Sequence, residues 1–238
     1  MTTLERGRRL HILRDSAVYL VTEESLSDGR RSEEVALAAL QAGVRVVQVR
    51  EKAGSGRRML EIARALRETT RRFGALLIVD DRVDVALASD ADGIHLGQED
   101  LPLSVARELL GEDALIGLSI TEASQLAAQD ALVADYLGVG AVFPTDSKAD
   151  ATLTGLALLQ ASARATSAPI VAIGGIDLSN VGAAVAAGAD VVAVISAITR
   201  ADDPGRAAAD LVRVARATLA ARDTGVPASG SAASEWRR

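Results

Sequence analysis

IVAIGGIDLSNVGAAVAAGADVVAVIS, residues 170–196, is the stretch that decides the fold. Two short runs rich in β-branched residues, Ile170–Gly175 and Val191–Ser196, flank an alanine-rich segment, Leu178–Ala187, with helical spacing of its apolar residues. Both runs are almost continuously apolar, as expected of parallel strands that helices cover on the outside. Asp177 precedes the helical segment and is a residue type that caps helices. The stretch therefore predicts a strand–helix–strand unit of a parallel sheet.

The same alternation of strand and helix runs through the chain from Val18 onward. The strands expected before this unit are Val18–Thr22, Val44–Glu51, Leu76–Asp81, Gly93–Gly97, Leu115–Ile120 and Tyr136–Phe143. The other expected helices are Glu33–Ala42, Arg57–Arg72, Val83–Ala88, Ser104–Leu110, Glu122–Ala131, Gly155–Ala165 and Arg206–Ala221. This pattern favours an α/β fold of a single domain, a closed (β/α)₈ barrel (TIM barrel) over residues 18–221. An open doubly wound sheet stays as the alternative, because periodicity does not show closure.

The composition of the 238 residues excludes several classes of protein. With 49% apolar residues the chain can bury a large core. Because it has no cysteine, it forms no disulfide, thiolate zinc site or cysteine nucleophile. A net charge of −6 and only 2% aromatic residues argue against a nucleic-acid partner. No uncharged apolar run reaches the roughly 18 residues of a membrane span.

The two ends of the chain differ from the barrel segment. Residues 1–17 hold a basic run with no hydrophobic segment after it, so we expect a short lead-in rather than a signal sequence. Residues 222–238 turn to Ala, Ser, Gly, Thr and Pro and lose their period, which predicts a disordered tail. A chain without cysteine or signal sequence fits a cytoplasmic location. Its oligomeric state stays open, and a homo-oligomer is compatible with the sequence.

Chemistry in a parallel barrel lies in the loops at the carboxyl ends of the strands. Gly174 and Gly175 end one strand there, and Ser196 ends the last one. Glycine lets backbone N–H groups approach a ligand closely, and a helix N-terminus adds positive potential. The alternative for the glycine pair is a plain turn between strand and helix. Together the two strand ends favour phosphate binding.

Carboxylates follow two neighbouring strands at this rim. Asp80 and Asp81 end one strand, and Asp100 follows the next. Proteins usually hold magnesium with one or two carboxylates together with water and substrate phosphates, so Asp81 and Asp100 are candidate Mg²⁺ ligands. Capping of the following helix is the alternative role for both. His95 lies inside a strand, and we assign it no catalytic role.

Only two of the 26 basic residues are lysines, Lys52 and Lys148, and both fall at the same rim as Arg50. Arginine is the ordinary surface cation of this chain, so a solvated surface role explains the two lysines poorly. Several cations next to magnesium-binding carboxylates are what a diphosphate requires, because its charge must be neutralised on binding and on leaving. The rim therefore predicts a diphosphate site.

Four motifs at these positions resemble the thiamine phosphate synthase family. They are Gln48–Lys52 (QVREK), Asp92–Asp100 (DGIHLGQED), Gly138–Lys148 (GVGAVFPTDSK) and Ala172–Ile176 (AIGGI), within a similarity that extends from Val18 to Leu219. The resemblance implies a (β/α)₈ barrel that joins 4-amino-2-methyl-5-(diphosphooxymethyl)pyrimidine to 4-methyl-5-(2-phosphooxyethyl)thiazole, or to its carboxylated form. The products would be thiamine phosphate and diphosphate, formed by a dissociative substitution at the pyrimidine methylene carbon.

The resemblance also implies a role for each matching residue. The catalytic residues would be Arg50, Lys52, Ser119 and Lys148. The pyrimidine diphosphate would be held by Gln48, Val49, Arg50, Glu51, Lys52, Asp80, Ser119 and Lys148. The thiazole phosphate would be held by Thr145, Asp146, Ser147, Gly175, Ile195 and Ser196. Mg²⁺ is the implied cofactor, with Asp81 and Asp100 as its ligands.

The chain departs from the family's pattern at four positions. The family usually has asparagine at the position of Asp80, histidine at that of Thr121, and proline and threonine at those of Ala141 and Ser147. An ionised aspartate cannot donate a hydrogen bond to a phosphate oxygen. Asp80 must therefore accept from the amino group of the substrate, join the metal, or be protonated.

Three other functions stay open from the residues alone. The related thiazole tautomerases share the barrel and the thiazole phosphate site, but they have no diphosphate to neutralise. A sugar-phosphate isomerase or an aldolase uses the same barrel, and an aldolase needs a strand-borne lysine that forms a Schiff base, whereas Lys52 and Lys148 lie beyond their strands. A non-catalytic member of the family would bind thiamine phosphate without turnover.

Overall fold

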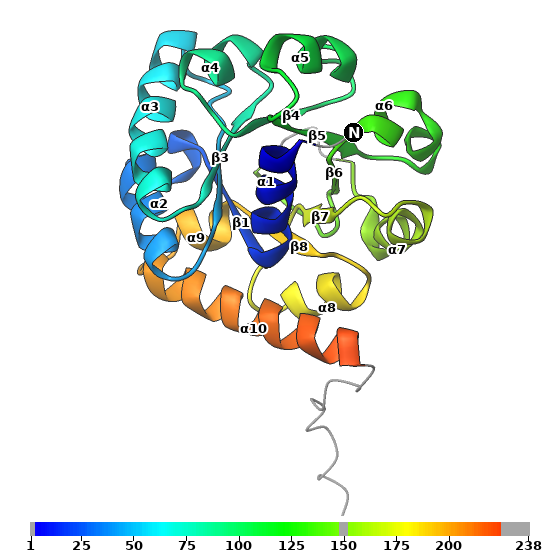
Figure 1. The fold of residues 1–238 in the computed structure, drawn as a ribbon. Helices are drawn as coiled ribbons and strands as arrows, with labels where there is room; N and C mark the ends of the chain where they lie inside the picture. Colours follow the sequence, from blue (N-terminus) through cyan, green and yellow to red (C-terminus); the bar gives the residue numbers. More distant parts are fainter. Residues whose placement is uncertain (1–2, 148–151, 225–238) are drawn as a thin grey trace, which may run out of the picture.

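The eight predicted strands form one closed parallel barrel (Figure 1). The computed structural model describes residues 3–147 and 152–224. The strands are β1 (Val18–Thr22), β2 (Val46–Val49), β3 (Leu76–Asp80), β4 (Gly93–Leu96), β5 (Leu115–Ile120), β6 (Tyr136–Val139), β7 (Ile170–Ile173) and β8 (Val191–Val194). Each strand pairs in parallel with the next, and β8 closes the ring on β1, where Leu20 lies opposite Val194. The TIM barrel is thus confirmed, and the open sheet is excluded.

Helices connect the strands and surround the barrel (Figure 1). They are η1 (Glu24–Leu26), α2 (Ser32–Gln41), α3 (Gly56–Arg72), α4 (Val83–Ala88), α5 (Leu103–Leu110), α7 (Gly155–Ala165), α8 (Val181–Ala186), α9 (Ser196–Thr199) and α10 (Pro204–Thr224). In α3, Met59, Ile62 and Leu66 recur on one buried face, and the Ser55 hydroxyl caps the helix by accepting the Arg58 N–H at 3.2 Å. No helix in the described part of the chain combines the length and apolarity needed to cross a membrane.

The structure differs from the predicted helices mainly at Glu122–Ala131 and at the end of the barrel segment. The first segment divides into the 3₁₀ helix η2 (Ala123–Ala127), which begins with a capping box, and α6 (Gln129–Val133), because the backbone of Ala128 between them is extended. α10 continues to Thr224, so residues 222–224 of the predicted disordered tail are helical. The rest of that tail, residues 225–238, lies outside the described residues.

Strand side chains alternate between two cores. Leu76 and Leu115 point into the barrel and fill its interior together with Tyr19 and Tyr136. Neighbouring side chains such as that of Leu77 point outward and form the larger core between barrel and helices. Because successive side chains of a strand face opposite sides, this alternation decides which residue at each strand end reaches the mouth of the barrel.

Residues 1–17, expected to be a short lead-in, contain a helix that the sequence analysis missed. α1 (Leu4–Asp15) lies across the ring of strands (Figure 1), with Leu13 fully buried against the interior core. Arg6 and Arg9 of this helix pair with Asp135 and Asp92, which directly precede β6 and β4. α1 therefore covers the amino-terminal end of the barrel. Its sequence is largely polar and lacks an apolar stripe, so periodicity gives no helical signal there.

An aspartate directly before each of β4, β6 and β8 links neighbouring strands. Asp92, Asp135 and Asp190 each accept a backbone N–H of the preceding strand at 2.9 Å. Each aspartate also pairs with an arginine of a surrounding helix, at 2.6 to 3.1 Å. Asp92 and Asp135 are buried, whereas the Asp190 side chain is 35% exposed. These ion pairs hold the end of the barrel opposite to the mouth.

Candidate active site

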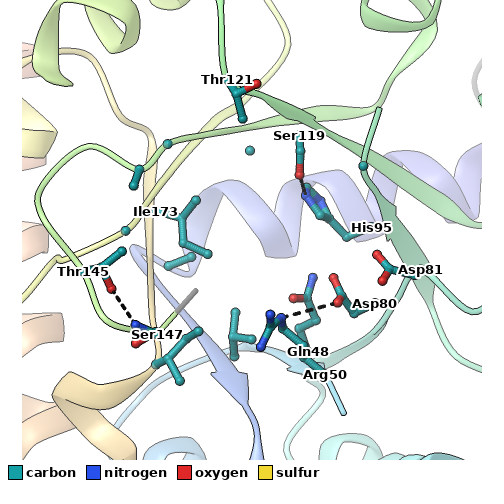
Figure 2. Close-up of a pocket in the computed structure, with 18 of the residues that line it drawn as sticks. Gln48, Arg50, Asp80, Asp81, His95, Ser119, Thr121, Thr145, Ser147 and Ile173 are labelled. Atoms are coloured by element: carbon teal, nitrogen blue, oxygen red, sulfur yellow. Dashed lines mark hydrogen bonds and ion pairs between the residues drawn. The ribbon is translucent and has the colours of Figure 1, made fainter. Parts of the chain in front are cut away.

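A cavity of about 640 Å³ opens at the carboxyl ends of the strands (Figure 2). The predicted site residues that line it are Gln48, Arg50, Lys52, Asp80, Asp81, Asp100, Ser119, Thr145, Ser147, Gly175, Ile195 and Ser196. They lie in the last residues of strands β2 to β8 or in the loops that follow, so closure of the barrel brings distant parts of the sequence to one mouth. Figure 2 shows Arg50, Asp80 and Asp81 on one side of the cavity, and Thr145 and Ser147 on another.

Three predicted site residues are placed away from the large cavity, and a fourth is not described by the structure. The Val49 side chain belongs to the outer core, because side chains alternate along β2, and so it does not reach the cavity. Glu51 lines a smaller neighbouring cavity of about 200 Å³ and accepts the Glu24 N–H at 3.0 Å. Asp146 is exposed and is not part of the lining of the large cavity. Lys148 lies outside the described residues.

Cations and carboxylates meet on one side of the cavity. We call the following group the charge cluster: Glu23, Arg50, Lys52, Asp80, Asp81 and Asp100. Arg50 contacts Glu23, and its Nε lies 3.7 Å from Oδ2 of Asp80. Lys52 Nζ lies 3.3 Å from the same Asp80 oxygen and contacts Asp81. Both cations therefore share Asp80.

Burial changes the proton affinity of the groups in the charge cluster. It raises the pKa of Asp80 to about 6, and the neighbouring Asp81 adds to the rise, while Lys52 and Arg50 oppose it. Burial alone would lower the pKa of Lys52, but Asp80 and Asp81 outweigh it, so the pKa is raised. At neutral pH the Lys52 ammonium group is therefore charged and can face an anionic substrate.

Asp81 and Asp100 form a carboxylate pair suited to a divalent cation. Burial raises the pKa of Asp100, Asp81 adds to the rise, and the Gly97 N–H, which donates to Asp100 at 2.6 Å, opposes it. Four carboxylates and two cations leave the charge cluster with two negative charges, the charge that one Mg²⁺ balances. No group of three or more His, Asp or Glu forms a metal cage in residues 3–147 and 152–224, but Mg²⁺ usually takes only one or two protein carboxylates.

The capping alternative is wrong for Asp100. Its carboxylate accepts the Gly97 N–H, which precedes it in the loop after β4. The residue at the N-cap of α5 is Pro102, which has no side-chain cap. The Asp100 side chain is thus turned toward the cavity and not toward the helix.

The side of the cavity away from the charge cluster consists of backbone and hydroxyl groups. Gly174 and Gly175 have φ values of 97° and 63°, and a Cβ at Gly175 would stand 2.2 Å from the Pro144 carbonyl oxygen. Only glycine fits this position without moving the backbone. Ser196 begins the short helix α9, and the Thr145 hydroxyl accepts the Ser147 N–H at 3.2 Å. The loops predicted to hold a phosphate therefore line one cavity.

Glu23 of the charge cluster is not among the site residues predicted from the sequence, and His95, to which no catalytic role was assigned, has hydrogen-bond partners on both ring nitrogens. Glu23 follows β1, is almost completely buried and contacts Arg50, and only its position at a strand end signals it. His95 lines the cavity, and its Nε2 lies 2.9 Å from Oγ of Ser119. Its ring fits because Gly117 and Gly138 have no side chain: a Cβ there would come within 2.6 and 2.7 Å of the ring. Glycine inside a strand is the signal of such a close approach.

Fold and cavity together define the class of protein. It is a (β/α)₈ barrel with a charge cluster and a cavity at the carboxyl ends of the strands, where enzymes with this fold have their active sites. The family model described as thiamine monophosphate synthase matches residues 18–198, and the chain belongs to this family.

Named relatives agree with the family model over most of the chain. The thiamine-phosphate synthase of Haloarcula marismortui is 50% identical over 198 residues, which cover 82% of this chain and 94% of that protein. The thiamine-phosphate synthase of Chloroflexus aurantiacus is 50% identical over 205 residues, covering 84% and 93%. The solved structure of a thiamine phosphate pyrophosphorylase from Pyrococcus furiosus is 39% identical, with a TM-score of 0.79 over 87% of this chain and 99% of that one.

Proposed function

We propose that the chain is a magnesium-dependent transferase of thiamine biosynthesis. It joins the pyrimidine diphosphate to the thiazole phosphate and releases diphosphate. With the carboxylated form of the thiazole phosphate, CO₂ is released as well. The observation that carries this proposal is that one cavity has the charge cluster on one side and loops of glycine and hydroxyl residues on the other. In a member of this family, the charge cluster would serve the diphosphate of one substrate, and the loops would serve the phosphate of the other.

The charge cluster supports departure of the diphosphate. Arg50 and Lys52 supply fixed positive charge next to the leaving oxygen, and Ser119 lines the same cavity. Charges positioned before the reaction stabilise the transition state without reorganisation. When bound by Asp81 and Asp100, Mg²⁺ supplies further positive charge to the diphosphate. Lys148 is assigned to this task by resemblance alone.

The phosphate side of the cavity holds the second substrate in line. Gly175, Ser196 and the Thr145–Ser147 loop bind the thiazole phosphate and aim the ring nitrogen at the pyrimidine methylene carbon. The C–O bond breaks with its electron pair going to diphosphate, and the aminopyrimidine ring stabilises the cation. The thiazole nitrogen lone pair then forms the new C–N bond. The reaction needs no protein nucleophile, which agrees with a chain without cysteine.

A product assay separates this function from its nearest alternative. The purified protein is incubated with the pyrimidine diphosphate, the carboxylated thiazole phosphate and Mg²⁺, and products are identified by mass spectrometry. The proposal expects thiamine phosphate. Isomerisation of the thiazole ring without thiamine phosphate would identify a tautomerase instead, and binding without any product would identify a non-catalytic member.

Asp80→Asn is expected to retain activity, and its initial rate is expected to depend less strongly on the Mg²⁺ concentration. The substitution removes one of the two excess negative charges of the charge cluster but keeps an acceptor oxygen for Lys52 or for the amino group of the substrate. Initial rates are measured against Mg²⁺ concentration, with Asp84→Asn, an exposed residue of α4, as the matched control. Complete inactivation by Asp80→Asn would show that the role of this position is misread.

The cytoplasmic location and the oligomeric state stay predictions from the sequence. The small-molecule substrates belong to the proposed function.

A further inference from the structure

A chain of hydrogen bonds crosses the interior of the barrel below the cavity. Gln48 Nε2 donates to the Tyr19 hydroxyl at 3.0 Å, and the Tyr19 and Tyr136 hydroxyls lie 3.3 Å apart. The Tyr136 hydroxyl lies 3.2 Å from His95 Nδ1, and His95 Nε2 lies 2.9 Å from Ser119 Oγ. Both ends of this polar chain, Gln48 and Ser119, line the cavity (Figure 2).

Packing fixes the members of the polar chain. Tyr136 is fully buried and Tyr19 is 2% exposed, so neither hydroxyl has bulk water as an alternative partner. The His95 ring stacks on the Tyr136 ring, with centroids 5.5 Å apart and planes 28° apart. Gly117 and Gly138 leave only the space that this ring fills. Residues held this closely can transmit a preference from one end of the polar chain to the other.

Because each group inside the polar chain has one proton to donate, all its hydrogen bonds must point in the same direction along the chain. Each hydroxyl has one proton to donate, and so has a neutral imidazole. Burial raises the pKa values of Tyr19 and Tyr136, so both hydroxyls keep their protons at pH 7. The hydrogen-bond partners of the two His95 ring nitrogens are hydroxyl groups and not carboxylates, which favours the neutral imidazole. If Tyr19 accepts from Gln48, it donates to Tyr136, and Tyr136 donates to His95 Nδ1.

We propose that Tyr136, supported by Tyr19, is a positioning residue that keeps the His95 proton on Nε2, so that His95 donates to Ser119 and the Ser119 proton points into the cavity. This inference rests on the proposed function in one respect, the contact of Ser119 with the pyrimidine diphosphate. Phosphate oxygens only accept hydrogen bonds, so a serine that must donate to them benefits from a neighbour that fills its acceptor position.

Donation in the opposite direction along the polar chain would place the His95 proton on the other ring nitrogen. If the Gln48 amide turned its oxygen to Tyr19, every donor in the polar chain would reverse. His95 would then carry its proton on Nδ1, and Ser119 would donate its own hydrogen bond to His95. Ser119 would offer only an acceptor to the substrate. The position of the His95 proton therefore reports the direction of the whole polar chain.

Nitrogen NMR reads this proton directly, because the chain has only two histidines. The protein is labelled with ¹⁵N-histidine, and the signals of His11, which is 76% exposed, are assigned with the His11→Gln variant. We expect His95 to show a protonated Nε2 and an unprotonated Nδ1 at pH 7. In Tyr136→Phe this preference is lost, because no hydroxyl donates to Nδ1. A protonated Nδ1 in the wild-type protein would overturn the inference.

Kinetics then test whether the tautomer matters for the reaction. Tyr136→Phe is expected to lower kcat about 10-fold, in the range of one lost hydrogen bond to a positioned donor, with the KM of the thiazole phosphate unchanged. Tyr19→Phe is the matched control: it leaves the bond between Tyr136 and His95 in place and is expected to lower kcat only about 2-fold. A larger effect of Tyr19→Phe than of Tyr136→Phe would contradict the proposed order of donors.

A double-mutant cycle separates positioning from general damage to the barrel. If Tyr136 acts through Ser119, the variant with both Tyr136→Phe and Ser119→Ala turns over no more slowly than Ser119→Ala alone. Independent, multiplying effects would overturn the inference. Failure of the proposed function looks different, since the wild-type protein would then form no thiamine phosphate, while the NMR result on His95 would stand by itself.

Discussion

Arg50→Ala is expected to lower kcat by about 10²- to 10³-fold, the usual loss for one group that stabilises developing charge in a closed site. The Arg50 side chain is 13% exposed and its guanidinium is held between Glu23 and Asp80, so no solvent cation replaces it in the same place. Steady-state rates of thiamine phosphate formation at saturating concentrations of both substrates measure the effect.

Arg57→Ala is the matched control for Arg50→Ala. Arg57 is an exposed arginine in the first turn of α3, so its removal changes the net charge equally without touching the charge cluster. Its kcat is expected to match that of the parent. An Arg50→Ala variant that also turned over at the parent rate would remove the diphosphate assignment.

Asp135→Asn is expected to lower the free energy of unfolding by about 3 kcal/mol, because it leaves mostly buried cations short of their counter-ion. Asp135 pairs with Arg6 of α1 at 3.1 Å and with Arg107 of α5 at 2.7 Å, and it accepts the Ile116 N–H at 2.9 Å. The carboxylate thus joins two helices and a strand at the closed end of the barrel. Urea unfolding followed by circular dichroism measures the change.

Asp190→Asn makes the matching change at an exposed site. Asp190 precedes β8 as Asp135 precedes β6, and it accepts the Ile170 N–H and pairs with Arg222 at 3.1 Å. Both partners of this pair are about one-third exposed, so solvent screens them, and we expect a loss of about 1 kcal/mol or less. Equal losses at the two positions would contradict the role assigned to burial and to α1.

Much of the fold follows from local sequence patterns. Apolar runs such as Ile170–Ile173 and helices such as Gly155–Ala165 were predicted within a few residues, because each is encoded by its own periodicity. The position of Arg50, Asp81 and Asp100 at one mouth also followed, since parallel strands share the end at which they stop. The family resemblance added the roles, which geometry alone does not assign.

What escaped prediction depends on contacts between distant segments. α1 is held by packing of its Leu13 against the interior core and by ion pairs with Asp92 and Asp135, which lie far from it in sequence. The polar chain from Gln48 to Ser119 likewise joins residues of five strands, β1, β2, β4, β5 and β6. Val49 was placed in the site by motif, but strand alternation turns its side chain into the outer core.

The central claim is that the mouth of the barrel stabilises the departing diphosphate of the pyrimidine substrate while the thiazole phosphate is bound in the same cavity. Release of diphosphate by the purified protein, measured with both substrates and with Mg²⁺ present or withheld, tests it most directly. We predict one diphosphate for each thiamine phosphate formed, with a rate that falls when Mg²⁺ is withheld. No diphosphate from the complete mixture would contradict the claim.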